Sequence, residues 1–231
     1  MSISSERREL LELYKDLRVA DVRDGMDWNM MHHYGSMSPD IKALLRTRVC
    51  GIARTARYVP YQGNVPQMSP EEYTEWQFWY ESEICPAPWC VDIEEGDFMV
   101  IDGSGIDSGF LGSNNSLAFH KLGVRGYVID GGVRDTDELI LERIPMWYRI
   151  ISQKMIQGRM QYDAKDVPVT VGGVVVCPSD VVVADGDGVI VVPRKIAFNV
   201  AKYAHQELRN DKAGRKALYE EMGRELDSTV I

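Results

Sequence analysis

The sequence predicts an α/β fold that ends in a long helix. Short runs rich in valine and isoleucine recur through the middle and the C-terminal half, and glycine, proline or aspartate bounds them, as is typical of β-strands. Charged segments with apolar residues at helical spacing stand near both ends. The 231 residues, 45% of them hydrophobic, can bury one sizeable core, so we expect a single domain over residues 1–231.

The N-terminal part is predicted to contain two helices, over residues 6–17 and 19–26, and strands over residues 48–59. An aromatic segment follows over residues 61–92, with Ser69 as a good N-cap for a helix over residues 70–83. Its aromatic side chains indicate packing or a subunit contact, and a lid over a substrate site is the alternative. The tryptophans of this segment are Trp76, Trp79 and Trp89.

A strand over residues 98–102 is followed by a glycine-containing turn and by a short helix over residues 115–122. Backbone N–H groups at a helix start favour a carboxylate or an enolate oxygen. The residues at this turn are therefore candidates for substrate binding: Gly112, Ser113, Asn114 and Asn115.

Residues 123–139 are the most informative stretch, because an apolar run and a glycine pair lead directly into Arg134 and Asp135. A guanidinium beside a carboxylate at a strand end can hold an anionic substrate and a cation together. The alternative interpretation is a capping box in which Asp135 and Glu138 only begin a helix.

The C-terminal half is predicted to form strands over residues 167–171, 174–177, 181–184 and 189–192. A helical tail occupies residues 195–231, with a long helix to residue 222 and a local break at Gly214. Of the four cysteines, Cys50 and Cys177 are expected in the core and Cys85 and Cys90 in a loop.

The charge balance limits the classes of partner. A net charge of −9, from 35 acidic and 26 basic residues, argues against a general nucleic-acid-binding surface. No apolar run approaches the length of a transmembrane helix, and the N-terminus is charged rather than signal-like. We therefore expect a cytoplasmic protein with reduced thiols and without a membrane or nucleic-acid partner.

Several separated segments resemble the family of regulator of ribonuclease activity A and the class II pyruvate aldolases, including the 4-hydroxy-4-methyl-2-oxoglutarate/4-carboxy-4-hydroxy-2-oxoadipate aldolases. The resemblance covers most of the chain except the neighbourhood of residues 61–92. It implies a single swivelling β/β/α-type domain and a homotrimer or a dimer of trimers. The segments are residues 18–27, 36–59, 96–105 and 171–194, together with the Arg134-Asp135 pair.

The resemblance also implies site roles. Asp135 matches the ligand of a divalent metal, Mg²⁺ or Mn²⁺, and Arg134 the arginine that positions a small anionic 2-oxo acid. The family has an acidic residue at the position of Ser113, so this chain departs from the pattern there. In the family an acid from the tail of a neighbouring subunit completes the site, and Glu207 and Asp211 are the candidates.

Three hypotheses for function remain. The first is a metal-dependent lyase that cleaves a small 2-oxo acid, by aldol cleavage or oxaloacetate-type decarboxylation, through a pyruvate enolate. The second is another reaction at the same site, such as hydration, dehydration or hydrolysis, which the serine at position 113 favours. The third is a non-catalytic protein-binding module like the ribonuclease regulator.

Overall fold

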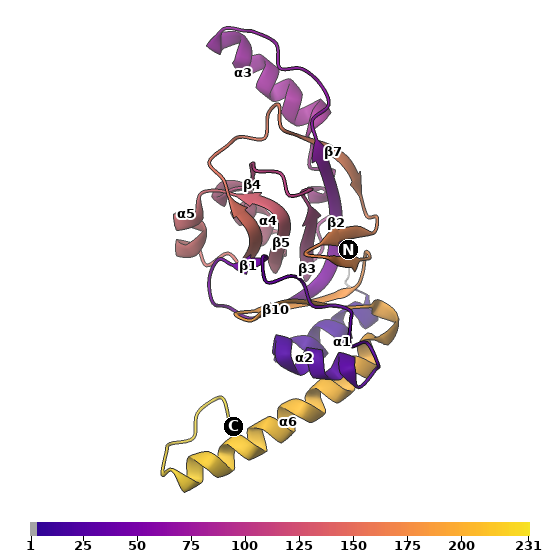
Figure 1. The fold of residues 1–231 in the computed structure, drawn as a ribbon, viewed down its shortest axis with the longest axis vertical. Coiled ribbons are helices and arrows are strands. Elements are labelled where there is room, and N and C mark those ends of the chain that lie inside the picture. Colours follow the sequence, from indigo (N-terminus) through magenta and orange to yellow (C-terminus); the bar gives the residue numbers. More distant parts are fainter. Residues whose placement is uncertain (1–3) are drawn as a thin grey trace.

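The computed structural model describes residues 4–231 and has a nearly closed, barrel-like sheet with a long C-terminal helix (Figure 1). Nine strands form the sheet in the order β1-β6-β5-β3-β2-β10-β11, with β4 paired to β5 and β7 paired to β2. The strands of this sheet are β1 (Lys42–Ala43), β2 (Val49–Pro60), β3 (Asp97–Asp102), β4 (Gly109–Leu111), β5 (Gly126–Val133), β6 (Met146–Ile151), β7 (Met160–Lys165), β10 (Val181–Asp185) and β11 (Gly188–Val192).

The centre of the sheet is parallel and its margins are antiparallel. β2, β3, β5 and β6 run parallel to one another, and β4 also pairs in parallel with β5. β10 pairs antiparallel with both β2 and β11, as β7 does with β2. A separate hairpin, β8 (Val169–Val171) and β9 (Val174–Val176), contributes four valines to the interior of the barrel: Val169, Val171, Val174 and Val176.

The alternation of side chains along the strands explains the layers. In β3, Phe98 and Val100 face the barrel interior with Trp147, while Met99 and Ile101 face the opposite layer. This second layer contains α4 (Ser113–Lys121) and α5 (Thr136–Leu141). A third cluster packs α1 (Ser5–Tyr14), α2 (Val19–Asp27) and α6 (Ala197–Glu221) against β2, β10 and β11.

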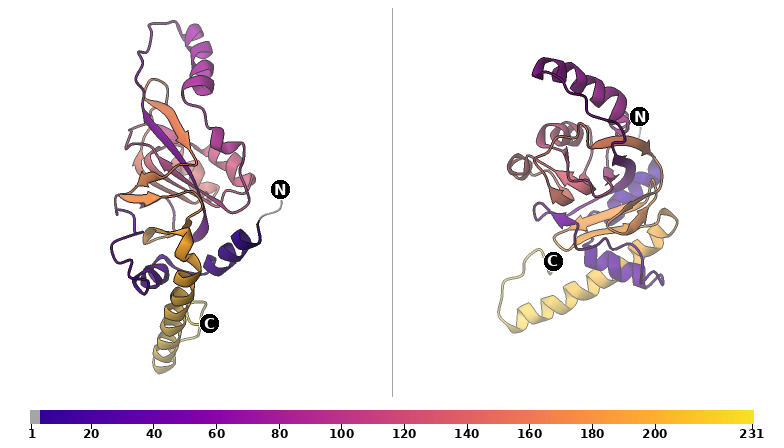
Figure 2. Two further views of the ribbon diagram at one scale, coloured as in Figure 1. Left: turned by 90° about the vertical axis from the view of Figure 1, so that its right-hand side faces the viewer. Right: turned by 45° about the horizontal axis from the view of Figure 1, so that its top comes forward.

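The aromatic segment forms α3 (Pro70–Trp79), a π-helical turn η1 (Tyr80–Ile84) and a 3₁₀ turn η2 (Pro88–Cys90). Figures 1 and 2 show α3 extending away from the sheet, at the end of the molecule opposite to α6. Ser69 accepts a hydrogen bond from the backbone N–H of Glu72 and caps α3, as the sequence predicts. The base of the segment is held firmly, because the buried Tyr80 donates its hydroxyl to the Met160 carbonyl at 2.6 Å.

The predicted α/β fold is confirmed, with two local corrections. Cys177 is exposed, so its placement in the core is wrong. Cys85 lies between η1 and η2, in a loop as predicted, and is buried there. The expected break at Gly214 does not occur, because α6 continues from Ala197 to Glu221. A Cβ at position 214 would meet nothing within 4 Å, so this exposed glycine breaks no packing and leaves the helical hydrogen bonds intact.

Four of the strands, β1, β4, β6 and β7, were not predicted from the sequence. β7 alternates apolar and polar residues, whereas β6 is an apolar and aromatic run that only Arg149 interrupts. No helix within residues 4–231 combines the length and the apolar character that crossing a membrane requires.

Candidate active site

The Arg134-Asp135 pair stands immediately after β5, where the chain turns into α5. The backbone N–H of Arg134 donates to the Leu111 carbonyl at 2.9 Å and so ties the end of β5 to β4. Asp135 adopts a left-handed conformation, with φ 55° and ψ 43°, which is uncommon for a residue other than glycine. Such backbone strain is concentrated at functional sites.

Asp135 does not cap α5. It occupies the N-cap position, but its side chain makes no capping hydrogen bond, so the capping-box interpretation is wrong. Its Oδ2 instead accepts a hydrogen bond from the backbone N–H of Ser113 at 3.1 Å. The carboxylate therefore points across to the start of α4, at the position where the sequence departs from the family's acidic residue.

Close packing around the Arg134-Asp135 pair leaves no room for a side chain at Gly109 or Gly112. A Cβ on Gly112 would stand 2.4 Å from Oδ2 of Asp135, and a Cβ on Gly109 would stand 2.8 Å from Cβ of Arg134. Any larger residue at position 112 would displace the carboxylate. The Nε of Arg134 lies 3.9 Å from the same Oδ2, and both side chains are 40% exposed. The pair is thus accessible to a ligand.

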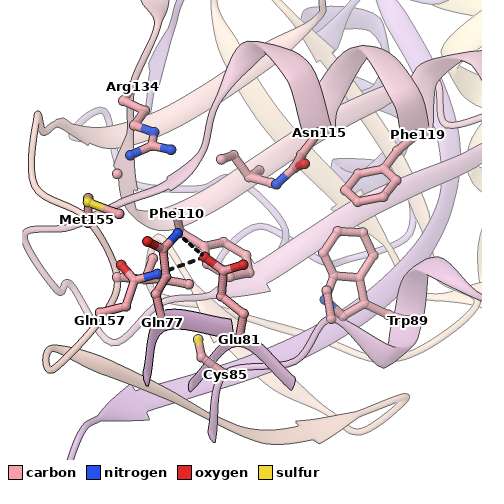
Figure 3. Close-up of a pocket in the computed structure, with 14 residues that line it drawn as sticks. Gln77, Glu81, Cys85, Trp89, Phe110, Asn115, Phe119, Arg134, Met155 and Gln157 are labelled. Carbon is pink, nitrogen blue, oxygen red and sulfur yellow. Dashed lines mark hydrogen bonds between the residues drawn. The ribbon is translucent and has the colours of Figure 1, made fainter. Parts of the chain in front are cut away.

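A cavity of about 230 Å³ opens beside the pair, and Arg134 and Asn115 are among its lining residues (Figure 3). Gly112 and Asp135 adjoin it as chain neighbours of the lining residues Leu111 and Arg134, and Ser113 is hydrogen-bonded to Asp135. Asn114 is exposed on α4 and is not part of the lining. The structure therefore brings together five of the eight predicted site residues: the Arg134-Asp135 pair, Gly112, Ser113 and Asn115.

The aromatic segment supplies a large part of the cavity wall. Gln77 from α3, Glu81 from η1, and Cys85, Ala87 and Trp89 from the following turn all line the cavity. Trp89 is fully buried, and its Nε1 donates to the Tyr58 hydroxyl at 2.8 Å. The segment therefore packs against the rest of the fold and lines the cavity, and its role as a lid over a substrate stays a prediction.

A polar cluster that the sequence did not indicate lies in this wall. The Nε2 atoms of Gln77 and Gln157 both donate to Oε1 of Glu81, at 3.1 and 2.7 Å (Figure 3). Gln157 is only 5% exposed, and its Oε1 has no hydrogen-bond partner among residues 4–231. Helical spacing relates Gln77 to Glu81, but 76 positions separate Glu81 from Gln157, so only the fold reveals the cluster.

Cys85 is a lining residue without nucleophilic character. Burial, followed by the nearby Glu81 carboxylate, raises the pKa of its thiol to about 12. The thiol therefore stays protonated at neutral pH, and the reactive species of a cysteine is the thiolate.

Glu207 and Asp211 lie on α6, far from the cavity within one chain (Figures 1 and 2). Oε1 of Glu207 accepts from Nε1 of Trp28 at 3.2 Å, and Oδ2 of Asp211 accepts from Nη2 of Arg18 at 2.6 Å. Neither contacts Asp135 in the same chain, so their assignment to a neighbouring subunit's site stays a prediction.

The residues present fit a divalent cation that takes few protein ligands. Within residues 4–231, no group of three or more His, Cys, Asp or Glu side chains is arranged to hold a metal. Asp135 uses Oδ2 for the Ser113 N–H, and its Oδ1 accepts no hydrogen bond from the described residues. Mg²⁺ keeps several waters and binds through one or two carboxylates plus substrate oxygens, which this single accessible carboxylate satisfies.

Comparison with known proteins gives three kinds of likeness. The family model described as "RraA-like: Aldolase/RraA" matches residues 19–191. A protein of Halalkalibacterium halodurans named "Putative 4-hydroxy-4-methyl-2-oxoglutarate aldolase" is 32% identical over 128 residues, which are 53% of this chain and 59% of that protein. A protein of the same name from Deinococcus radiodurans is 36% identical over 99 residues, 42% of this chain and 61% of that protein.

The matches to these curated relatives span about 60% of each relative's length. A likeness over nearly the whole chain comes from a solved structure, the Streptomyces coelicolor protein RraAS2, described as an unusual member of the RNase ES inhibitor RraA protein family. It superposes with a TM-score of 0.72 at 25% identity, over 93% of this chain and 98% of that one.

Proposed function

This chain belongs to the RraA-like family, and from that premise we propose that it is a divalent-metal-dependent lyase acting on a small 2-oxo acid. The observation that carries the proposal is the Asp135 carboxylate, which is turned away from its own helix and held by the Ser113 N–H beside Arg134 at the edge of a cavity. A structural cap needs none of this arrangement. The names of the aldolase relatives support the same reaction class.

In this proposal Arg134 binds the substrate carboxylate. Its guanidinium offers paired N–H donors that match the two carboxylate oxygens, and 40% of the side chain is accessible. Asp135 would hold Mg²⁺ or Mn²⁺, which when bound supplies positive charge next to the keto and carboxylate oxygens of the substrate. The Ser113 N–H fixes the carboxylate and is therefore not a free donor for substrate.

Aldol cleavage then needs two proton movements. The hydroxyl on C4 of the 2-oxo acid loses its proton to water, and C4 becomes the carbonyl carbon of the second product. The C3–C4 bond breaks, and its electron pair moves into the enolate of pyruvate. The enolate afterwards takes a proton at C3. Arg134 stabilises the negative charge that develops on the enolate oxygens, which is the stage at which stabilisation accelerates a reaction.

The test is a panel of 2-oxo acids with purified protein and Mg²⁺ or Mn²⁺, scored by pyruvate release. Oxaloacetate reports decarboxylation, and 4-hydroxy-2-oxo acids report aldol cleavage. We expect pyruvate from at least one compound, and a loss of that activity when EDTA removes the metal. Pyruvate release that persists in EDTA would contradict the assignment of Asp135 as a metal ligand.

We further propose that the complete site forms in a trimer or a dimer of trimers, with Glu207 or Asp211 of one chain beside Asp135 of the next. Mixed assemblies give a specific test. Asp135→Asn and Glu207→Gln chains, each inactive alone, should regain activity when they are unfolded and reassembled together, because some interfaces then carry both native acids. No recovery with either tail acid would exclude a shared site.

A second candidate is a protein-binding module without catalysis. The likeness to RraAS2 favours it, because that match spans 98% of the solved chain, whereas the aldolase relatives are matched over about 60% of their length. If the panel yields no product, including products of hydration or hydrolysis, and no metal binding is detected by calorimetry, this candidate replaces the lyase.

A further inference from the structure

The charges inside the cavity are few and separated. Among the 14 described residues that line it, the charged side chains are Arg134 and Glu81. A 2-oxo acid whose carboxylate pairs with Arg134 leaves no second cation in the lining. Any second carboxylate on the ligand would then share a 230 Å³ space with Glu81. Bringing like charges together without a compensating partner weakens binding.

Glu81 is held in the wall by neutral groups. The amides of Gln77 and Gln157 both donate to its Oε1 and fix its position without cancelling its charge. Gln157 reaches it from the loop between β6 and β7, so the carboxylate is held between two separate parts of the chain. The carboxylate is therefore held at this end of the cavity.

The orientation of the Gln157 amide adds a second constraint. Its Nε2 faces a carboxylate, which only accepts hydrogen bonds, so the other terminal atom must be the carbonyl oxygen. That oxygen is buried, has no partner among residues 4–231, and belongs to a residue that lines the cavity. Figure 3 shows the nitrogen turned to Glu81 and the oxygen turned away. An unpaired buried acceptor is satisfied by a donor, such as a hydroxyl, and not by a carboxylate.

Apart from the amide of Asn115, the remaining wall is apolar. Trp89 and Phe119 pack edge to face with ring centroids 5.0 Å apart, and Phe110 lines the same cavity. These rings suit an uncharged carbon chain and offer no hydrogen-bond donor to an ionised group, because the indole N–H of Trp89 is used by Tyr58.

From these contacts we infer that the cavity selects monocarboxylic 2-oxo acids with an uncharged, hydroxyl-bearing far end and rejects those with a second carboxylate. This inference rests on the proposed function for the role of Arg134. It assigns specificity to Glu81 and Gln157, which act on the ligand's far end and take no part in bond cleavage. Within the reaction class, it favours neutral 4-hydroxy-2-oxo acids over oxaloacetate.

The test compares two ligands that the proposed reaction does not cleave, 2-oxopentanoate and 2-oxoglutarate. They have the same chain length and differ in whether C5 is a methyl group or a carboxylate. Binding in the presence of Mg²⁺ is followed by calorimetry and by tryptophan fluorescence, since Trp89 lies in the wall. We expect wild type to bind 2-oxopentanoate at least tenfold more tightly. Glu81 is exposed to solvent, which weakens the repulsion, so a larger ratio is not required.

Glu81→Gln removes the charge and keeps the shape, and should reduce the preference to threefold or less. Glu83→Gln is the matched control, because Glu83 is exposed on the same π-helical turn and does not line the cavity. It should leave the ratio unchanged. Equal or tighter binding of 2-oxoglutarate by wild type, an unchanged ratio in Glu81→Gln, or failure of both ligands to bind would overturn the inference.

The two proposals fail separately. Selective binding of 2-oxopentanoate without pyruvate release from any 4-hydroxy-2-oxo acid would contradict the lyase and leave the selectivity intact. Pyruvate release with a preference for dicarboxylic substrates would contradict the selectivity and leave the lyase intact.

Discussion

The backbone N–H of Ser113 and the Oδ2 of Asp135 are joined by a 3.1 Å hydrogen bond that links the start of α4 to the end of β5. The contact brings Ser113, which stands where the family has an acidic residue, next to the proposed metal ligand Asp135. It also fixes the Asp135 side chain without using its second oxygen. The first four predictions follow from this arrangement.

Asp135→Asn should lower the rate of metal-dependent turnover about 10²-fold or more, because a neutral amide is a far weaker ligand for Mg²⁺ than a carboxylate. Asparagine accepts the Ser113 N–H and tolerates the left-handed backbone, so the free energy of unfolding should change by less than about 1 kcal/mol. Steady-state kinetics and urea denaturation measure the two effects. Asp137→Asn in the first turn of α5 is the control, and should be active.

Arg134→Lys keeps the positive charge and loses the paired donors. The apparent KM for a 2-oxo acid should rise about tenfold, since a single ammonium matches a carboxylate less well than a guanidinium fork. Initial rates over a range of substrate concentrations give the answer. A lysine variant with the wild-type KM would mean that charge alone is needed.

Gly112→Ala should impair activity through steric displacement, because the new methyl group would lie 2.4 Å from Oδ2 of Asp135. The backbone at Gly112, with φ −116°, suits any residue, so strain in the main chain plays no part. We expect a loss of metal affinity, measured by calorimetry, with about 1–3 kcal/mol of destabilisation from overpacking.

Gly214→Ala is the control for that substitution. It adds the same methyl group in open space within α6, and it should stabilise the protein by up to about 1 kcal/mol through helix propensity. Activity should not change. A wild-type metal affinity in Gly112→Ala would show that the carboxylate can move aside without consequence.

Ser113→Asp should increase pyruvate release tenfold or more, because it places an acid next to Asp135 that can orient a proton donor for the enolate. The start of α4 tolerates the added charge, since acidic residues are favourable in the first turn of a helix. Asn114→Asp adds the same charge one residue later, at a position without a hydrogen bond to Asp135, and should have no such effect. An unchanged rate in Ser113→Asp would mean that the proton comes from another group.

The buried Cys85 thiol predicts a specific pH dependence of stability. Burial raises its pKa to about 12 in the folded chain, above the value of about 8.5 for a free thiol, so folding favours the protonated form. The stabilisation is complete below the unfolded pKa and is lost as pH rises toward the folded pKa, at about 1.4 kcal/mol per pH unit. Between pH 9 and 10.5, wild type should therefore lose more unfolding free energy than Cys85→Ala, as measured by urea denaturation at each pH. Parallel slopes would contradict the burial of this thiol.

The sequence predicts the elements that carry a strong local signal. The valine-rich runs become β10 and β11 because their alternate residues fill two separate cores, and Ser69 begins α3 as a cap should. Strand β7 was missed because polar residues alternate along it, and β1 and β4 were missed because two or three residues carry no periodic signal. Strand β6 was missed although its residues are mostly apolar and aromatic, and its pairing with β5 fixes it.

The same limit applies to the site. Arg134 and Asp135 are adjacent in the chain and stand out as a motif, whereas Glu81 and Gln157 meet only after folding. The left-handed backbone of Asp135 also has no sequence signature, since the residue is followed by Glu138 at the spacing of a normal cap. Local patterns thus identify the reacting end of the cavity and miss its far end.

The aromatic segment forms one wall of the cavity, while α4 and the end of β5 form another. The stretch that discriminates between ligands can therefore change during evolution without altering the stretch that breaks bonds. Replacing residues 77–89 with the corresponding piece of a relative should transplant that relative's ligand preference onto this framework, provided that Tyr58 and Met160 keep their contacts with Trp89 and Tyr80. An exchange of this segment would change the substrate of the fold and leave the residues at the reacting end of the cavity unchanged.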